Sequence, residues 1–131
     1  MKDNYFENDF AEFWTEGSVL FFVYKPGVVV NLEAAKQIVR DRLTVQKNTP
    51  YPVFCDMRGI KDSDKPARDY LAKDGSTLVK AVAVLTDSPV TKIMLNFYLT
   101  ISRPLIPTKM FTDKKQALEF LKAASVQNTL K

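Results

Sequence analysis

A group of polar side chains that could do chemistry follows the short apolar stretch Tyr51–Asp56. In an α/β protein, ligands bind outside the carboxyl ends of strands, so a polar segment directly after a strand is a natural place for a site. Acids, cations and a serine in this place suit recognition or regulation better than a reaction. We therefore predict a partner-binding site made of Asp56, Arg58, Lys61, Ser63 and Arg68.

Asp56, at the end of the stretch, has two interpretations. It could accept a phosphoryl group or hold a cation of a partner. It could instead cap N–H groups of the loop or form an ion pair with Arg58, Lys61 or Arg68. We favour the structural interpretation over the functional one.

Ser63 also has two interpretations. We expect it at the N-terminus of a helix, where a phosphate would meet free N–H groups and the positive end of the helix dipole. Lys61 and Lys65 flank it and would favour a phosphate there. An ordinary capping serine is the simpler interpretation, and we prefer it.

Composition excludes several kinds of catalytic site. The chain has no histidine, so Ser/His/Asp, Cys/His and histidine-based metal sites are ruled out. The single cysteine, Cys55, lies among apolar residues, where a free thiol acts as a small hydrophobe. Asp56, Thr86 and Lys109 follow the order of the residues in a phospho-receiver domain, but the acidic pair that would hold Mg²⁺ is missing. We therefore expect no enzyme, no cofactor and no metal site.

The charge distribution favours an ordinary solvated surface. The formal charge is +4, but nineteen Lys and Arg residues are interleaved with fifteen Asp and Glu residues, whereas nucleic-acid binders gather cations in a patch. No apolar run approaches the roughly eighteen residues that span a bilayer, and the opening residues lack the pattern of a secretory signal. We expect a cytoplasmic protein without membrane insertion or nucleic-acid binding.

Apolar periodicity and turn residues predict alternating strands and helices, which is typical of a partly parallel sheet covered by helices. We expect one domain, with a core at about 11–124, an N-terminal extension at 1–10 and a flexible tail at 126–131. The expected strands are Ala11–Thr15 and Ser18–Tyr24 (a hairpin), Val28–Val30, Tyr51–Asp56, Ala81–Thr86 and Lys109–Phe111. The expected helices are Leu32–Gln46 with Asn31 as N-cap, Asp64–Lys73, Pro89–Ser102 with Ser88 as N-cap, and a terminal helix with Thr112 as N-cap.

The expected helix Pro89–Ser102 is apolar on nearly all sides, which predicts burial on more than one side. Its expected core stripe is Val90, Ile93, Met94, Phe97 and Ile101. A second face has to be covered by a partner subunit, by the aromatic N-terminal segment or by a ligand, and we favour a homodimer over a ligand groove. The residues assigned to this dimer or ligand face are Met94, Leu95, Tyr98 and Leu99.

Four segments together resemble the STAS fold (sulfate transporter and anti-sigma-factor antagonist), and specifically the uncharacterised SpoIIAA-like proteins. They are YPVFCDMRG, ARDYLA, KAVAVLTDSPV and PTKMFTDKKQALEFL. The resemblance implies an α/β fold with a mixed sheet of four to five strands that opens with a β-hairpin and is packed by about four helices. In regulatory relatives, a serine directly after the aspartate matched by Asp56 is phosphorylated. Met57 occupies that place here, so the resemblance does not carry the phosphoserine over.

These observations lead to two hypotheses of function. The first is a non-enzymatic, STAS-like regulatory module that binds a protein partner and forms a homodimer. The alternative is a protein that binds a small apolar or lipid-like ligand, with Met94, Phe97, Tyr98 and aromatic residues of the N-terminal segment lining the cavity.

Overall fold

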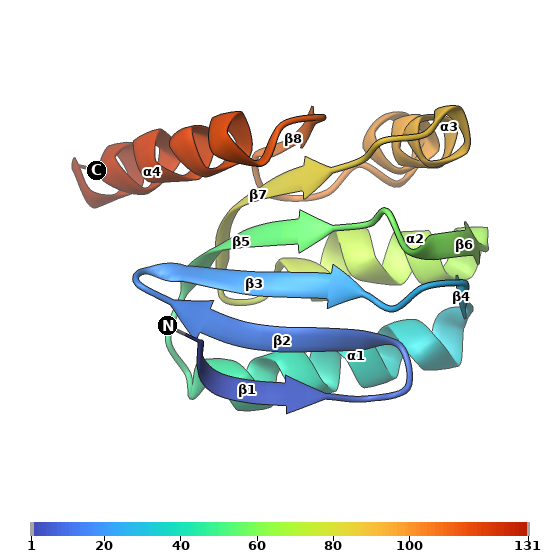
Figure 1. The fold of residues 1–131 in the computed structure, drawn as a ribbon, viewed down its shortest axis with the longest axis horizontal. Helices are drawn as coiled ribbons and strands as arrows, with labels where there is room; N and C mark the ends of the chain where they lie inside the picture. Colours follow the sequence, from blue (N-terminus) through green and yellow to red (C-terminus); the bar gives the residue numbers. More distant parts are fainter. Residues whose placement is uncertain (1, 131) are drawn as a thin grey trace.

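The central feature of the molecule is a twisted sheet with helices on both faces (Figure 1). The computed structural model describes the backbone of residues 2–130 and their side chains, apart from those of Val90 and 125–130. Three helices cover one face of the sheet and the terminal helix covers part of the other. The helices are α1 (Leu32–Gln46), α2 (Lys65–Lys73), α3 (Pro89–Phe97) and α4 (Lys114–Leu130), with a 3₁₀ turn at Asp74–Ser76 and a π-helical turn at Tyr98–Ser102.

The main sheet has six strands in the order β1-β2-β3-β5-β7-β8. The strands β1, β2 and β3 pair antiparallel, and β3, β5, β7 and β8 pair parallel. The two short strands β4 and β6 pair parallel with each other in a separate ribbon. The strands are β1 (Asp3–Glu7), β2 (Ala11–Glu16), β3 (Val19–Tyr24), β4 (Val28–Val30), β5 (Tyr51–Asp56), β6 (Ile60–Ser63), β7 (Val79–Leu85) and β8 (Thr108–Phe111).

The expected mixed α/β fold, with its opening hairpin and four helices, is confirmed, but the expected sheet of four to five strands is too small. Strand β1 lies within the supposed extension 1–10 and pairs with β2. Its residues are exposed at every position, so they carry no alternation of apolar and polar side chains that a sequence argument could detect. Strand β6 was also missed. The flexible tail expected at 126–131 falls on residues whose side chains lie outside the description, and it stays a prediction.

Side-chain caps fix where the helices begin. Asn31 accepts a hydrogen bond from Ala34 N at 2.9 Å, and Ser88 accepts one from Thr91 N at 3.2 Å, which confirms both predicted N-caps. At the terminal helix the prediction is off by one residue. The carboxylate of Asp113, and not Thr112, accepts from a backbone N–H of the first turn.

Gly59 fixes the approach of β6 to the end of β3. A Cβ atom at this position would lie 2.6 Å from the carbonyl oxygen of Tyr24 and 2.8 Å from that of Lys25, closer than packing allows. The carbonyl of Gly59 accepts a hydrogen bond from Gly27 N at 2.7 Å. The absence of a side chain therefore lets the β5–β6 turn pack on the backbone that follows β3, and this places β6 across the end of the sheet.

The alternation of side chains along the strands divides the core into two parts. In β5, Val53 and Cys55 face α1, α2 and α3, whereas Phe54 faces α4. On the α4 side, Ala117 and Leu121 are fully buried against the sheet, and Leu118 and Phe120 are half-buried. These two parts of the core are called the cavity face and the α4 face below.

The expected helix Pro89–Ser102 differs from the prediction in shape and in orientation. It is α-helical only to Phe97 and ends in the π-helical turn. Three residues of the expected core stripe are exposed, and the side chain of a fourth, Val90, lies outside the described residues. The exposed fractions are 58% for Ile93, 48% for Phe97 and 53% for Ile101.

The orientation of α3 follows from a polar contact at its first turn. Thr91 is buried, and its hydroxyl lies within hydrogen-bond distance of the Thr86 hydroxyl and bonds the carbonyl of Ser88. With Thr91 directed inward, the residues one turn further on the same side are Met94 and Leu95. Both are buried, so the inward face of α3 is rotated away from the predicted stripe.

Candidate functional site

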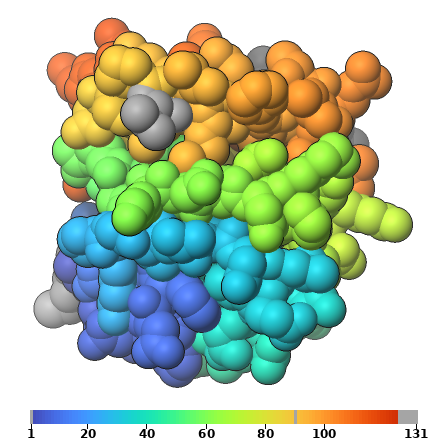
Figure 2. Space-filling model, turned by 90° about the vertical axis from the view of Figure 1, so that its right-hand side faces the viewer, coloured from blue at the N-terminus to red at the C-terminus, as the bar shows by residue number. Residues whose placement is uncertain are grey.

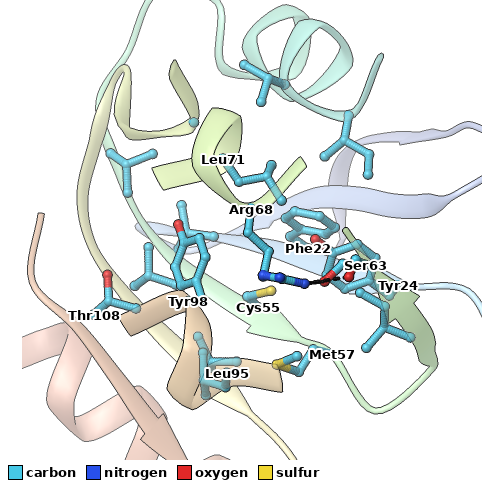
Figure 3. Close-up of a pocket in the computed structure, with 18 of the residues that line it drawn as sticks. Phe22, Tyr24, Cys55, Met57, Ser63, Arg68, Leu71, Leu95, Tyr98 and Thr108 are labelled. Carbon is cyan, nitrogen blue, oxygen red and sulfur yellow. Dashed lines mark hydrogen bonds between the residues drawn. The ribbon is translucent and has the colours of Figure 1, made fainter. Parts of the chain in front are cut away.

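A cavity of about 110 Å³ lies between the sheet and the three helices of the cavity face (Figure 3). Its size is in the range in which an apolar protein cavity binds a molecule such as benzene. Most of its wall is apolar or aromatic. The sheet contributes Phe22, Tyr24, Val53, Cys55, Val82, Val84 and Thr108, and the helices contribute Ile38, Val39, Leu71, Met94, Leu95 and Tyr98.

The cavity exists because α3 and the segment after it are held to other elements and not pressed onto the sheet. Helix α3 packs against β6, and the π-helical turn packs against α2. The hydroxyl of Ser102 donates to the carboxylate of Asp69 at 2.8 Å, and Leu105 N donates to the carbonyl of Ala72 at 3.3 Å. Both contacts tie the end of this segment to α2, which leaves space between α3 and the strands.

Arg68 brings a charge into this apolar space. It extends from α2, and its Nη1 donates to the carbonyl and, at 3.2 Å, to the hydroxyl of Ser63. Figure 3 shows the guanidinium lying between the ring of Tyr98 and Ser63, above Cys55. Arg68 is half-buried, so it is accessible from the cavity and partly from solvent.

Arg42 of α1 is a second cation in the wall, and it is almost fully buried. It donates to the side-chain oxygen of Gln46, to the carbonyl of Thr77 at 3.1 Å and to the carbonyl of Gly75 at 3.0 Å. Loss of water around the charge lowers the pKa of Arg42 to about 10. Arg42 thus stabilises the turn after α2 against α1, at the cost of a buried positive charge.

Burial acts on the neutral groups of the wall as well. Desolvation raises the pKa of Tyr24, of Tyr98 and of the Cys55 thiol well above their ordinary values. At neutral pH all three groups are therefore uncharged. Since the thiolate is the reactive form of cysteine, Cys55 serves here as an apolar wall residue, as its sequence context predicts.

The structure separates the five predicted partner-binding residues. Asp56 and Arg58 lie on the α4 face, while Ser63 and Arg68 lie at the cavity. Lys61 is exposed on β6. In Figure 2, which looks onto the carboxyl ends of the parallel strands, the green segment with β6 lies between the blue and cyan segments of β4 and α1 and the orange segment of α3.

Asp56 is engaged in its own ion pair. One oxygen of its carboxylate accepts from the backbone N–H and the Nε of Arg58 at 3.1 and 3.0 Å, and the other accepts from Nη2 at 2.8 Å. These contacts are the ones foreseen in the structural interpretation of this residue. The hydrogen bond to Asp56 also raises the pKa of Arg58.

Ser63 does not cap a helix. It is the last residue of β6, and Asp64 is the N-cap of α2, accepting from Ala67 N at 2.9 Å. The Ser63 side chain is directed into the cavity, and the residue is only 9% exposed. The hydroxyl is thus placed to bind a molecule in the cavity, next to Arg68, and is turned away from the surface.

The residues assigned to a dimer or ligand face lie on the inner side of α3 and of the π-helical turn that follows it. Met94 and Leu95 are buried, and Tyr98 and Leu99 are half-buried. Three of the four line the cavity; Leu99 packs in the same core without lining it. This position fits the ligand alternative better than a subunit contact. The exposed apolar residues of this segment are Ile93, Phe97, Ile101 and Leu105.

Arg42 is the member of the site that the sequence analysis missed, although a signal was present. It lies four residues after Ile38 and three after Val39, on the apolar stripe of the predicted helix. A cation inside such a stripe is a buried or cavity-lining group. The remaining wall residues were anticipated only as core.

The α4 face carries a second hollow, whose lining is more polar than that of the cavity. A hollow of about 290 Å³ lies over Trp14, Phe21 and Phe54. The Lys2 ammonium lies 4.1 Å from the Trp14 ring centre, and the Lys114 ammonium lies 5.5 Å from that of Phe21. The lysine side chains cover the rings and keep their charges in water.

No group of three or more Asp, Glu, Cys or His side chains among the described residues is arranged to hold a metal ion. No helix in the described part of the chain has the length and apolar character to cross a membrane.

Comparison with known proteins places this architecture among the SpoIIAA-like folds. The crystal structure of an uncharacterised protein of the DUF3478 family from Shewanella loihica PV-4, described as having a SpoIIAA-like fold, superposes with a TM-score of 0.58 over 92% of this chain and 95% of that one. The two sequences are 14% identical, so the likeness establishes the fold alone. It confirms the STAS-like resemblance at that level.

The chain belongs to the family described as a domain of unknown function, DUF7793, which matches residues 13–125. No curated protein matches the chain.

Proposed function

We propose that this protein is a non-enzymatic binding module whose cavity takes up one small ligand with an apolar body. The observation that supports this is the mostly apolar cavity, partly open to solvent, between the sheet and the inner side of α3. Filling it would remove apolar surface from water without any rearrangement of the sheet. The small-ligand alternative from the sequence thus becomes the first candidate.

The protein-binding, regulatory module in the cytoplasm, with a homodimer as its assembly, is the second candidate. The observation that favours it is the exposed apolar row of Ile93 and Phe97 on α3 and Ile101 in the π-helical turn. Large apolar side chains gathered on one helix face are typical of an interaction surface. A ligand in the cavity and a partner on the outer side of α3 are compatible, because they use opposite sides of the helix.

Benzene is the simplest probe of the cavity. Titrated into protein with ¹³C-labelled valine methyl groups, it is expected to give saturable shifts for Val53 and Val84 and to raise the melting temperature. The variant Val82→Phe fills the cavity and should abolish both effects. Val23→Phe makes the same change on the α4 face at a similarly half-buried position and should leave them intact.

Native mass spectrometry of freshly purified protein separates the two candidates. A small molecule that copurifies with wild type and Val23→Phe, but not with Val82→Phe, supports the cavity. A doubled mass without any bound molecule, together with no benzene-induced shift at saturation, rejects the cavity and favours the homodimer. Circular dichroism of each variant checks that it is folded.

A further inference from the structure

We propose that the ligand of the cavity is an anion: a small carboxylic acid with an apolar body, whose carboxylate is bound by Arg68. This inference rests on the proposed function and adds the chemical class of the ligand. It is carried by the charges around the cavity and by their hydrogen-bond partners.

The wall of the cavity contains two guanidinium groups and no carboxylate. Arg42 and Arg68 both line it. Among the ion pairs of the described residues, none includes either arginine. A positive charge next to an apolar space is unfavourable unless an anion compensates it. A bound anion would supply this compensation.

The acidic side chains closest along the chain to Arg68 are each engaged elsewhere. The carboxylate of Asp69 accepts from Lys65 Nζ at 2.7 Å and from Ser102 Oγ at 2.8 Å. Asp64 caps α2, and Asp62 accepts from Ser63 N at 2.8 Å. None of these carboxylates forms an ion pair with Arg68, although the Arg68 charge contributes to the lowered pKa of Asp69.

The hydrogen-bond geometry of Arg68 leaves one edge of its guanidinium for a ligand. Nη1 is bound to Ser63, and no other described side chain or carbonyl accepts from Nε or Nη2. This edge presents two parallel N–H groups, which match the two oxygens of a carboxylate. The Ser63 hydroxyl beside it can donate a third hydrogen bond. Figure 3 places this group of donors inside the cavity, next to Cys55 and Met57.

Arg42 has a different role, because its guanidinium is already hydrogen-bonded within the protein. Its hydrogen bonds to Gln46, Thr77 and Gly75 hold it in place. Arg42 also lines the cavity, and its nearby positive charge would favour an anion over a neutral molecule of the same shape. In this proposal Arg68 binds the carboxylate directly, and Arg42 contributes only its positive charge.

The test compares three probes with the same ring: benzene, benzamide and benzoate. Benzamide has nearly the shape of benzoate without the charge. Binding is followed by the shifts of the valine methyl groups at constant ionic strength. We expect wild type to bind benzoate at least about tenfold more tightly than benzamide, the effect of one charge-assisted pair of hydrogen bonds.

The variants locate the preference. Arg68→Gln should still bind benzene and benzamide, with whatever change the altered wall brings to both, and should lose the preference for benzoate over benzamide. Arg68→Lys keeps the positive charge but removes the two parallel N–H groups of the guanidinium, and it should retain part of the preference for benzoate. Arg58→Gln is the matched control on the α4 face, where the arginine already has Asp56 as its partner, and it should bind as wild type.

The outcomes separate this inference from the proposed function. If benzene and benzamide bind and benzoate binds no more tightly, or if Arg68→Gln keeps the preference, the inference is wrong and the cavity remains a ligand site. If none of the three probes binds wild type, the proposed function fails, and the inference fails with it.

Discussion

The two faces of the sheet use arginine in opposite ways. On the α4 face, Arg58 is half-exposed and is paired with Asp56 by two side-chain hydrogen bonds. On the cavity face, Arg42 is almost fully buried and Arg68 half-buried, and both bind only neutral oxygens. The comparison shows that polar residues close together in the sequence were separated by the fold, and that the two arginines without a carboxylate partner both line the cavity.

The same contrast holds for the apolar groups. The aromatic rings of the α4 face are covered by lysine side chains, whereas those of the cavity face surround an empty space. The cover on the α4 face is incomplete, because the Trp14 Nε1 is buried there without a hydrogen-bond partner. Under the proposed function, the ligand binds on the cavity face.

The largest expected effect is on the free energy of unfolding, because the core is filled at Leu121 on the α4 face and contains a cavity next to Met94 on the other face. Leu121 on α4 has no exposed surface, and Leu121→Ala should lower the free energy of unfolding by about 3 kcal/mol, because it opens a void in a filled core. Met94→Ala enlarges a cavity that already exists and should cost less, about 2 kcal/mol. Urea unfolding of both variants measures the difference, and equal losses would contradict the contrast in packing.

The next effect concerns the two kinds of arginine. Arg42→Met leaves the carbonyls of Gly75 and Thr77 without their donor, while it relieves the burial of a charge, and a net loss of about 2 kcal/mol is expected. Arg58→Met breaks a pair at the surface and should cost roughly 1 kcal/mol or less. Chemical denaturation compares them. A larger loss for Arg58→Met would overturn the distinction between the faces.

The smallest effect is a dependence on alkaline pH. Burial raises the pKa of Tyr98 above its ordinary value of 10.0, so its contribution to stability is complete below pH 10 and is lost above it, as only the unfolded chain ionises. Arg42, with its pKa lowered to about 10, acts in the opposite direction above that pH. Tyr98→Phe should therefore reduce the loss of stability between pH 9 and 11 by roughly 1 kcal/mol.

Tyr5 gives the matched comparison on the α4 face. Its hydrogen bond to Glu12 raises its pKa to about 12, but the side chain is exposed. Solvent screening should make the effect of Tyr5→Phe on the same pH profile smaller than that of Tyr98→Phe. Denaturation midpoints at several pH values give both slopes, and a steeper change for Tyr5→Phe would contradict the greater burial of Tyr98.

Elements with strong local signals were predictable from the sequence. Asn31 and Ser88 fix their helices by a side-chain cap, and the apolar run of β5 identifies a buried strand. Strands β1 and β6 were not predictable, because β1 is exposed throughout and β6 depends on the close approach at Gly59. Both depend on contacts between segments that are distant in the sequence.

The candidate site was predictable only in part. Proximity in the sequence grouped Asp56 with Arg68, but the alternation of the strand sends Asp56 to one face while α2 sends Arg68 to the other. The rotation of α3 was not visible either, because the burial of Thr91 is a tertiary contact that opposes the apolar pattern of the helix. The sequence thus identified several of the site residues, but packing between distant segments determines which of them lie together.

Cys55 gives the molecule a built-in sensor. Cys55 carries the single thiol of the chain, and it lies in the wall of the cavity near Arg68. Because burial keeps this thiol protonated, cyanylation requires the unfolded chain; after refolding, the stretching frequency of the nitrile would report whether its surroundings are wet, dry or occupied. No second thiol would compete for the label, so occupancy could be followed in the otherwise native chain.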